Sequence, residues 1–109
     1  MRAVPQLLLA LCAICSATLS YAADPKAALA RVQQVCAACH GIDGNSQVAD
    51  NPKIGGQYPD YLAKALRDYQ SGLRKNPVMA GFVDKLSRQD IENLAAYYAS
   101  QPAALVIKQ

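Results

Sequence analysis

Two cysteines and one histidine are the residues of this sequence whose types and spacing most clearly indicate chemistry. They lie in the run Val35-Cys36-Ala37-Ala38-Cys39-His40-Gly41, which is the pattern of covalent c-type haem attachment. On one helical turn the two thiols lie close together, so both can add to vinyl groups at one edge of a porphyrin, and the following imidazole can bind the iron. The sequence therefore predicts one haem c, attached through Cys36 and Cys39, with His40 as the proximal ligand of the iron.

A thiol redox site or a metal site is the alternative interpretation of a Cys-x-x-Cys pair. The first would accompany a βαβ pattern and the second would need further ligands, and His40 is the only histidine of the chain. Cys12 and Cys15 repeat the spacing, but Ser16 stands where a histidine would be needed. We therefore expect no function from this second pair.

Met79 is the candidate for the sixth position of the iron. The chain has no second histidine, which excludes bis-histidine ligation within it, and Met79 is its only methionine besides Met1. Met79 lies in a segment with Pro77 and Gly81, outside any helical stripe, so a loop can carry its thioether over the opposite haem face. Two other interpretations stay open. Met79 fills a gap in the core, or the iron keeps an open position, as in a haem sensor or peroxidase.

Pro52 and Arg74 are candidates for secondary roles at the same cofactor. A proximal histidine normally donates its other ring N–H to a carbonyl or carboxylate, and the Pro52 backbone carbonyl, in the loop after the motif, is a natural acceptor. Spacing alone is equally compatible with an ordinary turn proline. Arg74 could pair with a haem propionate, although an exposed arginine is the simpler interpretation.

Three helices are expected along the chain from residue 24. Starts are marked by Asp24-Pro25, by Pro59-Asp60 and by the capping box Ser87-Arg88-Gln89-Asp90, and ends by Gly41, Gly72 and Pro102. In the first helix the apolar stripe runs through Leu29, Val32 and Cys36.

Two long loops separate these helices, over Gly41–Gln57 and Leu73–Asp84, and a loosely held tail follows over Ala103–Gln109. Loops of this length in a compact domain need an explanation, which a large prosthetic group provides. No segment alternates as a strand does. The sequence therefore predicts an all-α fold, with three main helices and two long loops wrapped around one covalently bound haem.

The N-terminal segment has the composition of a secretory signal peptide. Arg2 is its only charge, an apolar run follows, and small residues precede a cleavage site after Ala22. We expect a signal peptide over residues 1–22, a cytochrome c domain over residues 23–109, and a periplasmic location. The alternative is a membrane anchor formed by an uncleaved N-terminal segment.

These residues make the chain resemble a small bacterial class I cytochrome c, and most closely one half of the two-haem periplasmic cytochromes. Besides the Cys36–Gly41 motif, the resemblance rests on Asn51-Pro52-Lys53-Ile54-Gly55-Gly56-Gln57-Tyr58, on Ser71-Gly72-Leu73-Arg74 followed by Met79, and on Leu86–Ile91 with Ala95-Ala96-Tyr97-Tyr98-Ala99. It implies the class I cytochrome c fold, His40 and Met79 as axial ligands, and the Pro52 carbonyl as the partner of His40. It also implies that the first and last helices cross, with Leu29 or Val32 meeting Leu94 or Tyr98. The chain departs from these relatives in carrying one haem motif where they carry two.

The expected function is one-electron transfer between redox partner proteins, a donor and an acceptor that include membrane-bound complexes. The formal net charge is only +3 and the basic residues are scattered, so the charge does not indicate a nucleic-acid partner. No nucleophile with its base and no general acid stands out, so we expect no enzyme activity and no small-molecule substrate. A monomer or weak dimer is expected. The alternative is an electron-transfer subunit fixed in an oxidase or dehydrogenase complex.

Overall fold

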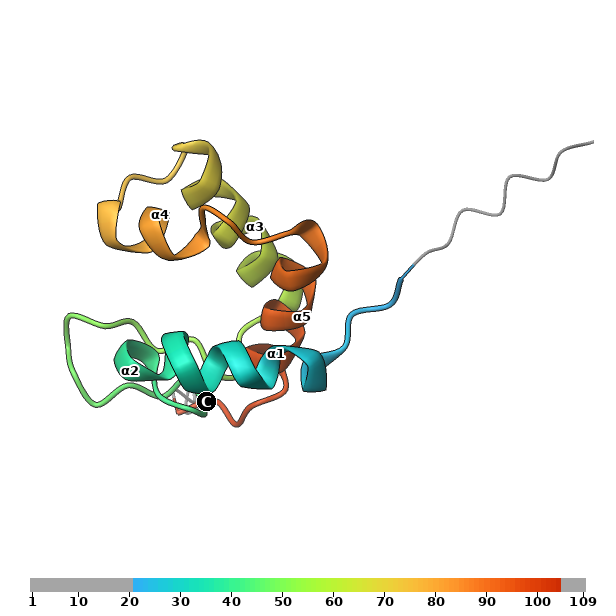
Figure 1. Cartoon of the computed structure of the whole chain (residues 1–109). Coiled ribbons are helices and arrows are strands. Elements are labelled where there is room, and N and C mark those ends of the chain that lie inside the picture. The colour runs from blue at the N-terminus through green and yellow to red at the C-terminus, as the bar shows by residue number, and fades with distance from the viewer. Residues whose placement is uncertain (1–20, 105–109) are drawn as a thin grey trace, which may run out of the picture.

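The computed structural model describes residues 21–104 and shows a chain built from helices (Figure 1). A continuous helical segment opens it, formed by α1 (Pro25–Arg31), a π-helical turn (Val32–Cys36) and α2 (Ala37–His40). Three helices follow, α3 (Pro59–Ser71), α4 (Pro77–Val83) and α5 (Arg88–Ala99). No strand occurs within residues 21–104, and the predicted all-α class is confirmed. Most of the expected signal peptide, residues 1–20, lies outside the described residues, as does the segment 105–109.

The predicted helix signals operate locally as expected. The Asp24 carboxylate accepts a hydrogen bond from the Lys26 backbone N–H at 2.9 Å, and Pro25 occupies the first turn of α1. This arrangement satisfies one of the free N–H groups of the helix start. At the C-terminal end of α3, Gly72 adopts φ +79°, a left-handed conformation that glycine adopts at no steric cost.

The first helix packs on the core with two of its three predicted stripe residues, Val32 and Cys36, but not with Leu29. Ala28 and Val32 are buried, whereas Leu29 is 40 % exposed, so the expected stripe is wrong at Leu29. A π-turn holds more residues than an α-turn. It therefore offsets the drift of a four-residue spacing, so that Ala28, Val32 and Cys36 share the face that packs on the core.

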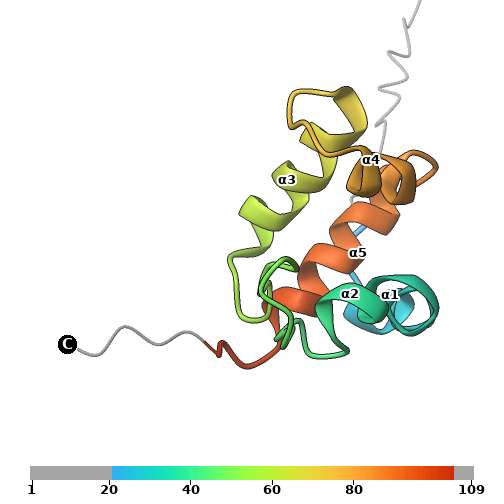
Figure 2. The ribbon, with the colours of Figure 1, turned by 90° about the vertical axis from the view of Figure 1, so that its left-hand side faces the viewer.

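Helix α5 is the element on which α1 and α3 pack. It contacts α1 and α3, and Figure 2 shows it between them. The buried core comprises Ala28, Val32, Leu62, Ala63, Val83, Leu86, Ile91, Leu94, Ala95 and Tyr98. Val32 thus shares one core with Leu94 and Tyr98, which confirms the expected crossing of the first and last helices. None of the helices in residues 21–104 has both the length and the apolar character that a bilayer span requires.

A reciprocal capping box fixes the start of α5. The Ser87 hydroxyl accepts from the Asp90 backbone N–H at 3.0 Å, and the Asp90 carboxylate accepts from the Ser87 N–H at 2.9 Å. These hydrogen bonds hold the pKa of Asp90 below its ordinary value of 3.8, because they favour the charged carboxylate.

Replacement of Asp90 with alanine is expected to lower the free energy of unfolding at neutral pH by about 0.5–1 kcal/mol, since one half of the capping box is lost. The folded-state pKa lies below the unfolded one. The contribution is therefore complete above the ordinary carboxyl pKa and is lost as the pH falls through the folded-state value. Denaturant unfolding at several pH values tests this, with the exposed Asp84→Ala as the control. A deficit of Asp90→Ala that persists unchanged at pH 2–3 would contradict the expectation.

The residues after α5 are held against the loop of residues 41–57. The Asn45 side-chain amide donates to the Pro102 carbonyl at 2.8 Å, and its oxygen accepts from the Ala104 N–H at 3.1 Å. Ala103 packs closely on Gly56, because a Cβ atom added to Gly56 would lie 2.7 Å from the Ala103 Cβ. The expectation of a loosely held tail is therefore wrong for Ala103 and Ala104, because a distant asparagine satisfies the backbone of this segment.

Candidate functional site

A cavity of about 440 Å³ lies between two parts of the molecule. Helices α3 and α4 form one side, α2 and the loop of residues 41–57 form the other, and α5 lies behind them (Figures 1 and 2). Leu62, Leu66, Val83, Leu94 and Ala95 give the lining much of its apolar character. This volume falls within the range of roughly 300–1,000 Å³ typical of cofactor and ligand sites. All the candidate residues from the sequence line this one cavity: Cys36, Cys39, His40, Pro52, Arg74 and Met79.

Cys36 and Cys39 present free thiols to the cavity from the helical segment that ends in α2. Cys36 is half-buried and Cys39 is exposed. Burial raises the pKa of Cys36 above its ordinary value of 9.0, and the neighbouring Arg31 cation opposes this shift without cancelling it. The Cys36 side chain therefore keeps its proton at neutral pH. Two thiols on one wall of an apolar cavity suit covalent attachment of a planar group along that wall.

His40 is the last residue of α2, and its side chain is buried beside the cavity. Its Nδ1 lies 2.9 Å from the Pro52 carbonyl oxygen. A carbonyl can only accept, so Nδ1 carries the proton in this contact. The other nitrogen of a neutral ring, Nε2, then holds a free lone pair, as a metal-binding imidazole requires.

The Pro52 carbonyl is held in place by hydrogen bonds across the base of its loop. The Gly44 carbonyl accepts from the N–H groups of Ile54 at 2.7 Å and Gly55 at 3.0 Å, and the Lys53 ammonium donates to the Ser46 carbonyl at 2.8 Å. Gly44 adopts φ +73°, and a Cβ atom there would come within 2.6 Å of the Gly55 nitrogen. Only glycine permits this close approach of the two backbone segments of the loop.

Met79 lies in the first turn of α4, on the opposite side of the cavity from His40. The sequence predicts a loop here, and the short helix Pro77–Val83 is a correction to that prediction. Asn76 explains it, because its side-chain oxygen accepts from the N–H groups of Val78 at 3.0 Å and Met79 at 3.1 Å. An asparagine cap followed by proline at the first helical position is a helix-start signal, so the sequence does carry the information.

We expect Asn76→Ala to loosen the turn that carries Met79. Loss of the cap should cost about 1 kcal/mol of stability, while Asn76→Ser, which retains a capping oxygen, should cost less. If the thioether binds the iron, the ferrous form of Asn76→Ala should also bind carbon monoxide faster than the Asn76→Ser control does. Equal carbon monoxide rates in the two variants would show that the cap does not hold Met79.

Arg74 follows α3 and lies at the edge of the cavity. Its guanidinium stacks over the Tyr69 ring, 5.1 Å from the ring centroid, a cation–π contact. The Tyr61 hydroxyl beside it raises the pKa of Arg74 further above its ordinary value, so the side chain is always charged. The position and charge of Arg74 are compatible with an anionic group at the cavity edge.

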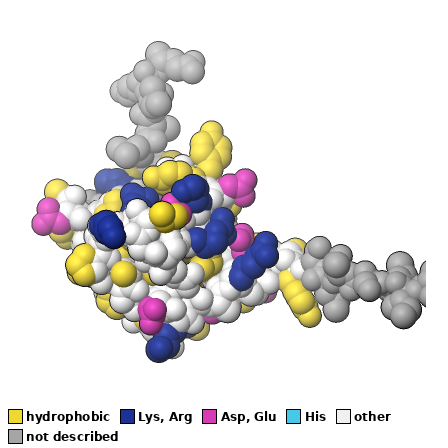
Figure 3. Space-filling view, turned by 90° about the horizontal axis from the view of Figure 1, so that it is seen from above, with side chains coloured by type: hydrophobic (Ala, Val, Ile, Leu, Met, Phe, Trp, Pro, Cys, Tyr) yellow, Lys and Arg dark blue, Asp and Glu magenta, His cyan; other side chains and the backbone are white. Residues whose placement is uncertain are grey.

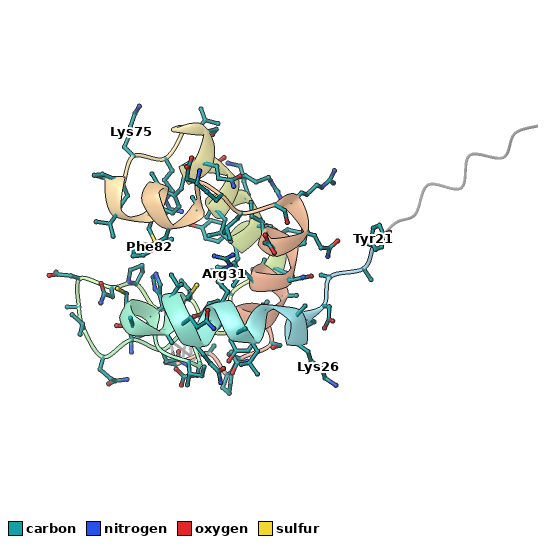
Figure 4. All side chains as sticks on the ribbon, in the orientation of Figure 1. Tyr21, Lys26, Arg31, Lys75 and Phe82 are labelled. Atoms are coloured by element: carbon teal, nitrogen blue, oxygen red, sulfur yellow. The ribbon has the colours of Figure 1, made fainter. Side chains whose placement is uncertain are left out.

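Arg31 and Phe82 are among the lining residues that the sequence does not single out. Figure 4 shows Arg31 on the side of α1 that faces α3 and α4, and Phe82 on the side of α4 that faces α2, whereas Lys75 points away from the cavity. Phe82 is half exposed at the cavity edge. Neither Arg31 nor Phe82 belongs to a local motif, and only the packing of distant helices brings them to the cavity.

The residues present fit a covalently attached haem. Two free thiols lie on one wall, a buried imidazole offers Nε2, and Met79 lines the cavity from α4. The remaining lining is mainly apolar, as a porphyrin requires, and it also includes the Arg31 and Arg74 guanidinium groups. This donor set matches a c-type haem with one nitrogen and one sulfur ligand.

Known proteins are similar to this chain in sequence and in architecture. Residues 23–97 match the family model described as cytochrome c oxidase, cbb3-type, subunit III. Cytochrome c4 of Thiocapsa roseopersicina is 46 % identical over 79 residues, which cover 72 % of this chain and 41 % of that protein. Cytochrome c-554(548) of Halomonas halodenitrificans is 39 % identical over 61 % of this chain and 83 % of its own length.

A solved structure agrees with these matches. The crystal structure of reduced recombinant cytochrome c4 from Pseudomonas stutzeri superposes with a TM-score of 0.69 at 43 % identity, covering 74 % of this chain and 47 % of that one. The chain therefore spans less than half the length of these cytochromes c4. Its cofactor is one haem c, covalently attached through Cys36 and Cys39. The chain belongs to the cytochrome c oxidase, cbb3-type, subunit III family and is a small class I c-type cytochrome that resembles one half of cytochrome c4.

Proposed function

We propose that this chain is a one-electron carrier whose haem iron is bound by His40 and Met79. The observation that carries the proposal is the cavity itself, which brings a buried imidazole and a thioether together from opposite walls, beside two thiols. The bound haem supplies an iron centre that can take up and release one electron. The similarity to cytochrome c4 and to cytochrome c-554(548) supports the same function.

The chain's own residues would keep the two oxidation states alike in structure. The Pro52 carbonyl fixes the orientation of the His40 ring and the tautomer that leaves Nε2 free. The Asn76 cap and the packing of Met79 against the core hold the thioether on the other side. The apolar lining would limit the access of water to the bound haem. Arg74 would pair with a haem propionate, held at the edge by Tyr69. With both ligands retained, little reorganisation would accompany each transfer.

A ferrous carbon monoxide titration separates this proposal from a five-coordinate sensor or peroxidase. The carrier should bind carbon monoxide slowly and weakly at neutral pH, because Met79 must first leave the iron. A Met79→Ala protein is the positive control and should bind it rapidly. Rapid, tight binding by the unaltered protein would overturn the proposal that Met79 is a ligand.

We further propose that the protein works in the periplasm after removal of residues 1–22. The apolar N-terminal run and the small residues before Ala23 support export. Covalent haem and an intact mass that begins at Ala23, measured on the periplasmic fraction, are the expected results. A mass that includes residues 1–22 in a membrane fraction would favour the anchored alternative.

The partners would be redox proteins, and the chain would catalyse no reaction of its own. Lys and Arg side chains are interspersed with Asp and Glu on the face shown in Figure 3, which supports protein partners over nucleic acid. We expect a monomer or weak dimer. The family description favours a second candidate, a subunit fixed in an oxidase or dehydrogenase complex. Purification at native levels distinguishes them, because a diffusible carrier should elute alone.

A further inference from the structure

The loop between His40 and α3 is fastened at both of its ends by one residue of α5. The Tyr98 hydroxyl donates to the carbonyl of Gly41, the residue directly after His40, at 3.2 Å. The backbone carbonyl of the same Tyr98 accepts from the Gly56 N–H at 2.9 Å. Residues 41 and 56 are therefore tied to a single point of the helix, and Pro52 lies on the loop between them.

The Tyr98 ring also supports the middle of this loop. A Cβ atom on Gly44 would lie 2.8 Å from the Tyr98 Cδ1, so the ring packs directly on the Gly44 backbone. The Gly44 carbonyl in turn accepts from the backbone N–H groups of Ile54 and Gly55, which follow Pro52 closely in the chain. A continuous set of contacts thus leads from the Tyr98 ring to the backbone that carries the Pro52 carbonyl.

Tyr97 adds a second attachment beside the first. Its hydroxyl donates to the Ile42 carbonyl at 2.7 Å, and its ring meets the Tyr98 ring edge to face, with centroids 5.2 Å apart. Tyr98 is 4 % exposed. Burial raises its pKa above the ordinary value of 10.0, so the hydroxyl remains a donor throughout the neutral and mildly alkaline range. The two tyrosines thereby hold the first two carbonyls after His40.

We propose that Tyr97 and Tyr98 are positioning residues that set the hydrogen bond between His40 Nδ1 and the Pro52 carbonyl, and through it the potential of the haem. The inference rests on the proposed function in one respect, that His40 binds the iron. A strong Nδ1–H···O bond makes the imidazole a better donor and favours the oxidised iron. A looser loop weakens that bond, so loss of either hydroxyl should raise the midpoint potential.

The test compares Tyr98→Phe and Tyr97→Phe with Tyr58→Phe in the haem-loaded protein. Each phenylalanine keeps the ring and removes the hydroxyl, and Tyr58 is a matched control because its side chain is 78 % exposed. Exchange of the His40 Nδ1 proton, followed by NMR in the reduced protein, should become about fivefold faster for each of the pair, the equivalent of one hydrogen bond. The potentials should rise in both. Exchange rates and potentials equal to those of Tyr58→Phe would overturn the inference, even if thermal stability fell.

A measurement on the unaltered protein decides the matter if either variant fails to accumulate. The Gly56 N–H and the His40 Nδ1–H should exchange with the same free energy of opening, because both depend on the attachment of the loop to Tyr98. A His40 proton that exchanges much faster than Gly56 would contradict the inference. Failure of the proposed function looks different, since the unaltered protein would then lack the spectrum of histidine and methionine ligation.

Discussion

Replacement of Met79 with alanine is expected to lower the midpoint potential by an amount on the order of 100 mV, while covalent haem attachment persists. A thioether favours the reduced iron more than water or hydroxide does, so its loss favours the oxidised state. Attachment should survive because Cys36 and Cys39 lie on the other wall of the cavity. Potentiometric titration measures the shift, and denatured-protein mass spectrometry measures the haem adduct.

Val78→Ala provides the matched control for this change. Val78 precedes Met79 in the same turn of α4 and is 63 % exposed. Its truncation perturbs the helix without removing a sulfur, so its potential should stay close to that of the unaltered protein. A potential of Met79→Ala that equals that of Val78→Ala would argue that Met79 fills the core and does not bind the iron.

Replacement of His40 with alanine is expected to reduce the yield of stable haem-loaded protein by at least about tenfold. His40 is buried, and its Nδ1 is already committed to the Pro52 carbonyl. Its loss removes the proximal ligand and leaves a polar loop carbonyl facing an empty space in the core. Pyridine haemochrome quantification of the purified protein gives the yield.

Pro52→Ala is the control for His40→Ala, because the contact of Pro52 is made by its backbone carbonyl. This variant retains the acceptor, so it should mature and keep its low-spin spectrum with only a small change in potential. A His40→Ala protein with normal colour and normal potential would contradict the assignment of His40 as proximal ligand.

The haem-attachment residues were predictable from a local sequence motif, and so were the helix ends that local capping signals mark. The Ser87–Asp90 capping box and the left-handed Gly72 appear where the sequence places them. The contact between His40 and Pro52 was also anticipated, because a proximal histidine needs an acceptor and the loop offers a carbonyl near it. Each of these features depends on residues within a few positions, or on one strong chemical requirement.

The features that the sequence did not reveal arise from packing between distant residues. Leu29 belongs to a regular helical stripe, yet Ala28 takes its place on the core face beside Val32 and Cys36, with the π-turn of residues 32–36 in the same segment. Asn45 fastens a segment nearly sixty residues away. The hydroxyl contacts of Tyr97 and Tyr98 likewise join α5 to the loop after His40, and helical periodicity marks Tyr98 only as a core residue. Helix α4 is different, because the Asn76-Pro77 cap that starts it is a local signal of the sequence.

The visible spectrum of the purified haem-loaded protein, recorded oxidised and reduced, tests the central claim most directly. A carrier with His40 and Met79 on the iron should be low-spin in both states. It should show the bands of a thioether-linked haem and, when oxidised, the weak long-wavelength band of a sulfur-to-iron charge transfer, which Met79→Ala should abolish. A high-spin spectrum, or a low-spin spectrum in which that band is absent from the unaltered protein, would contradict the account.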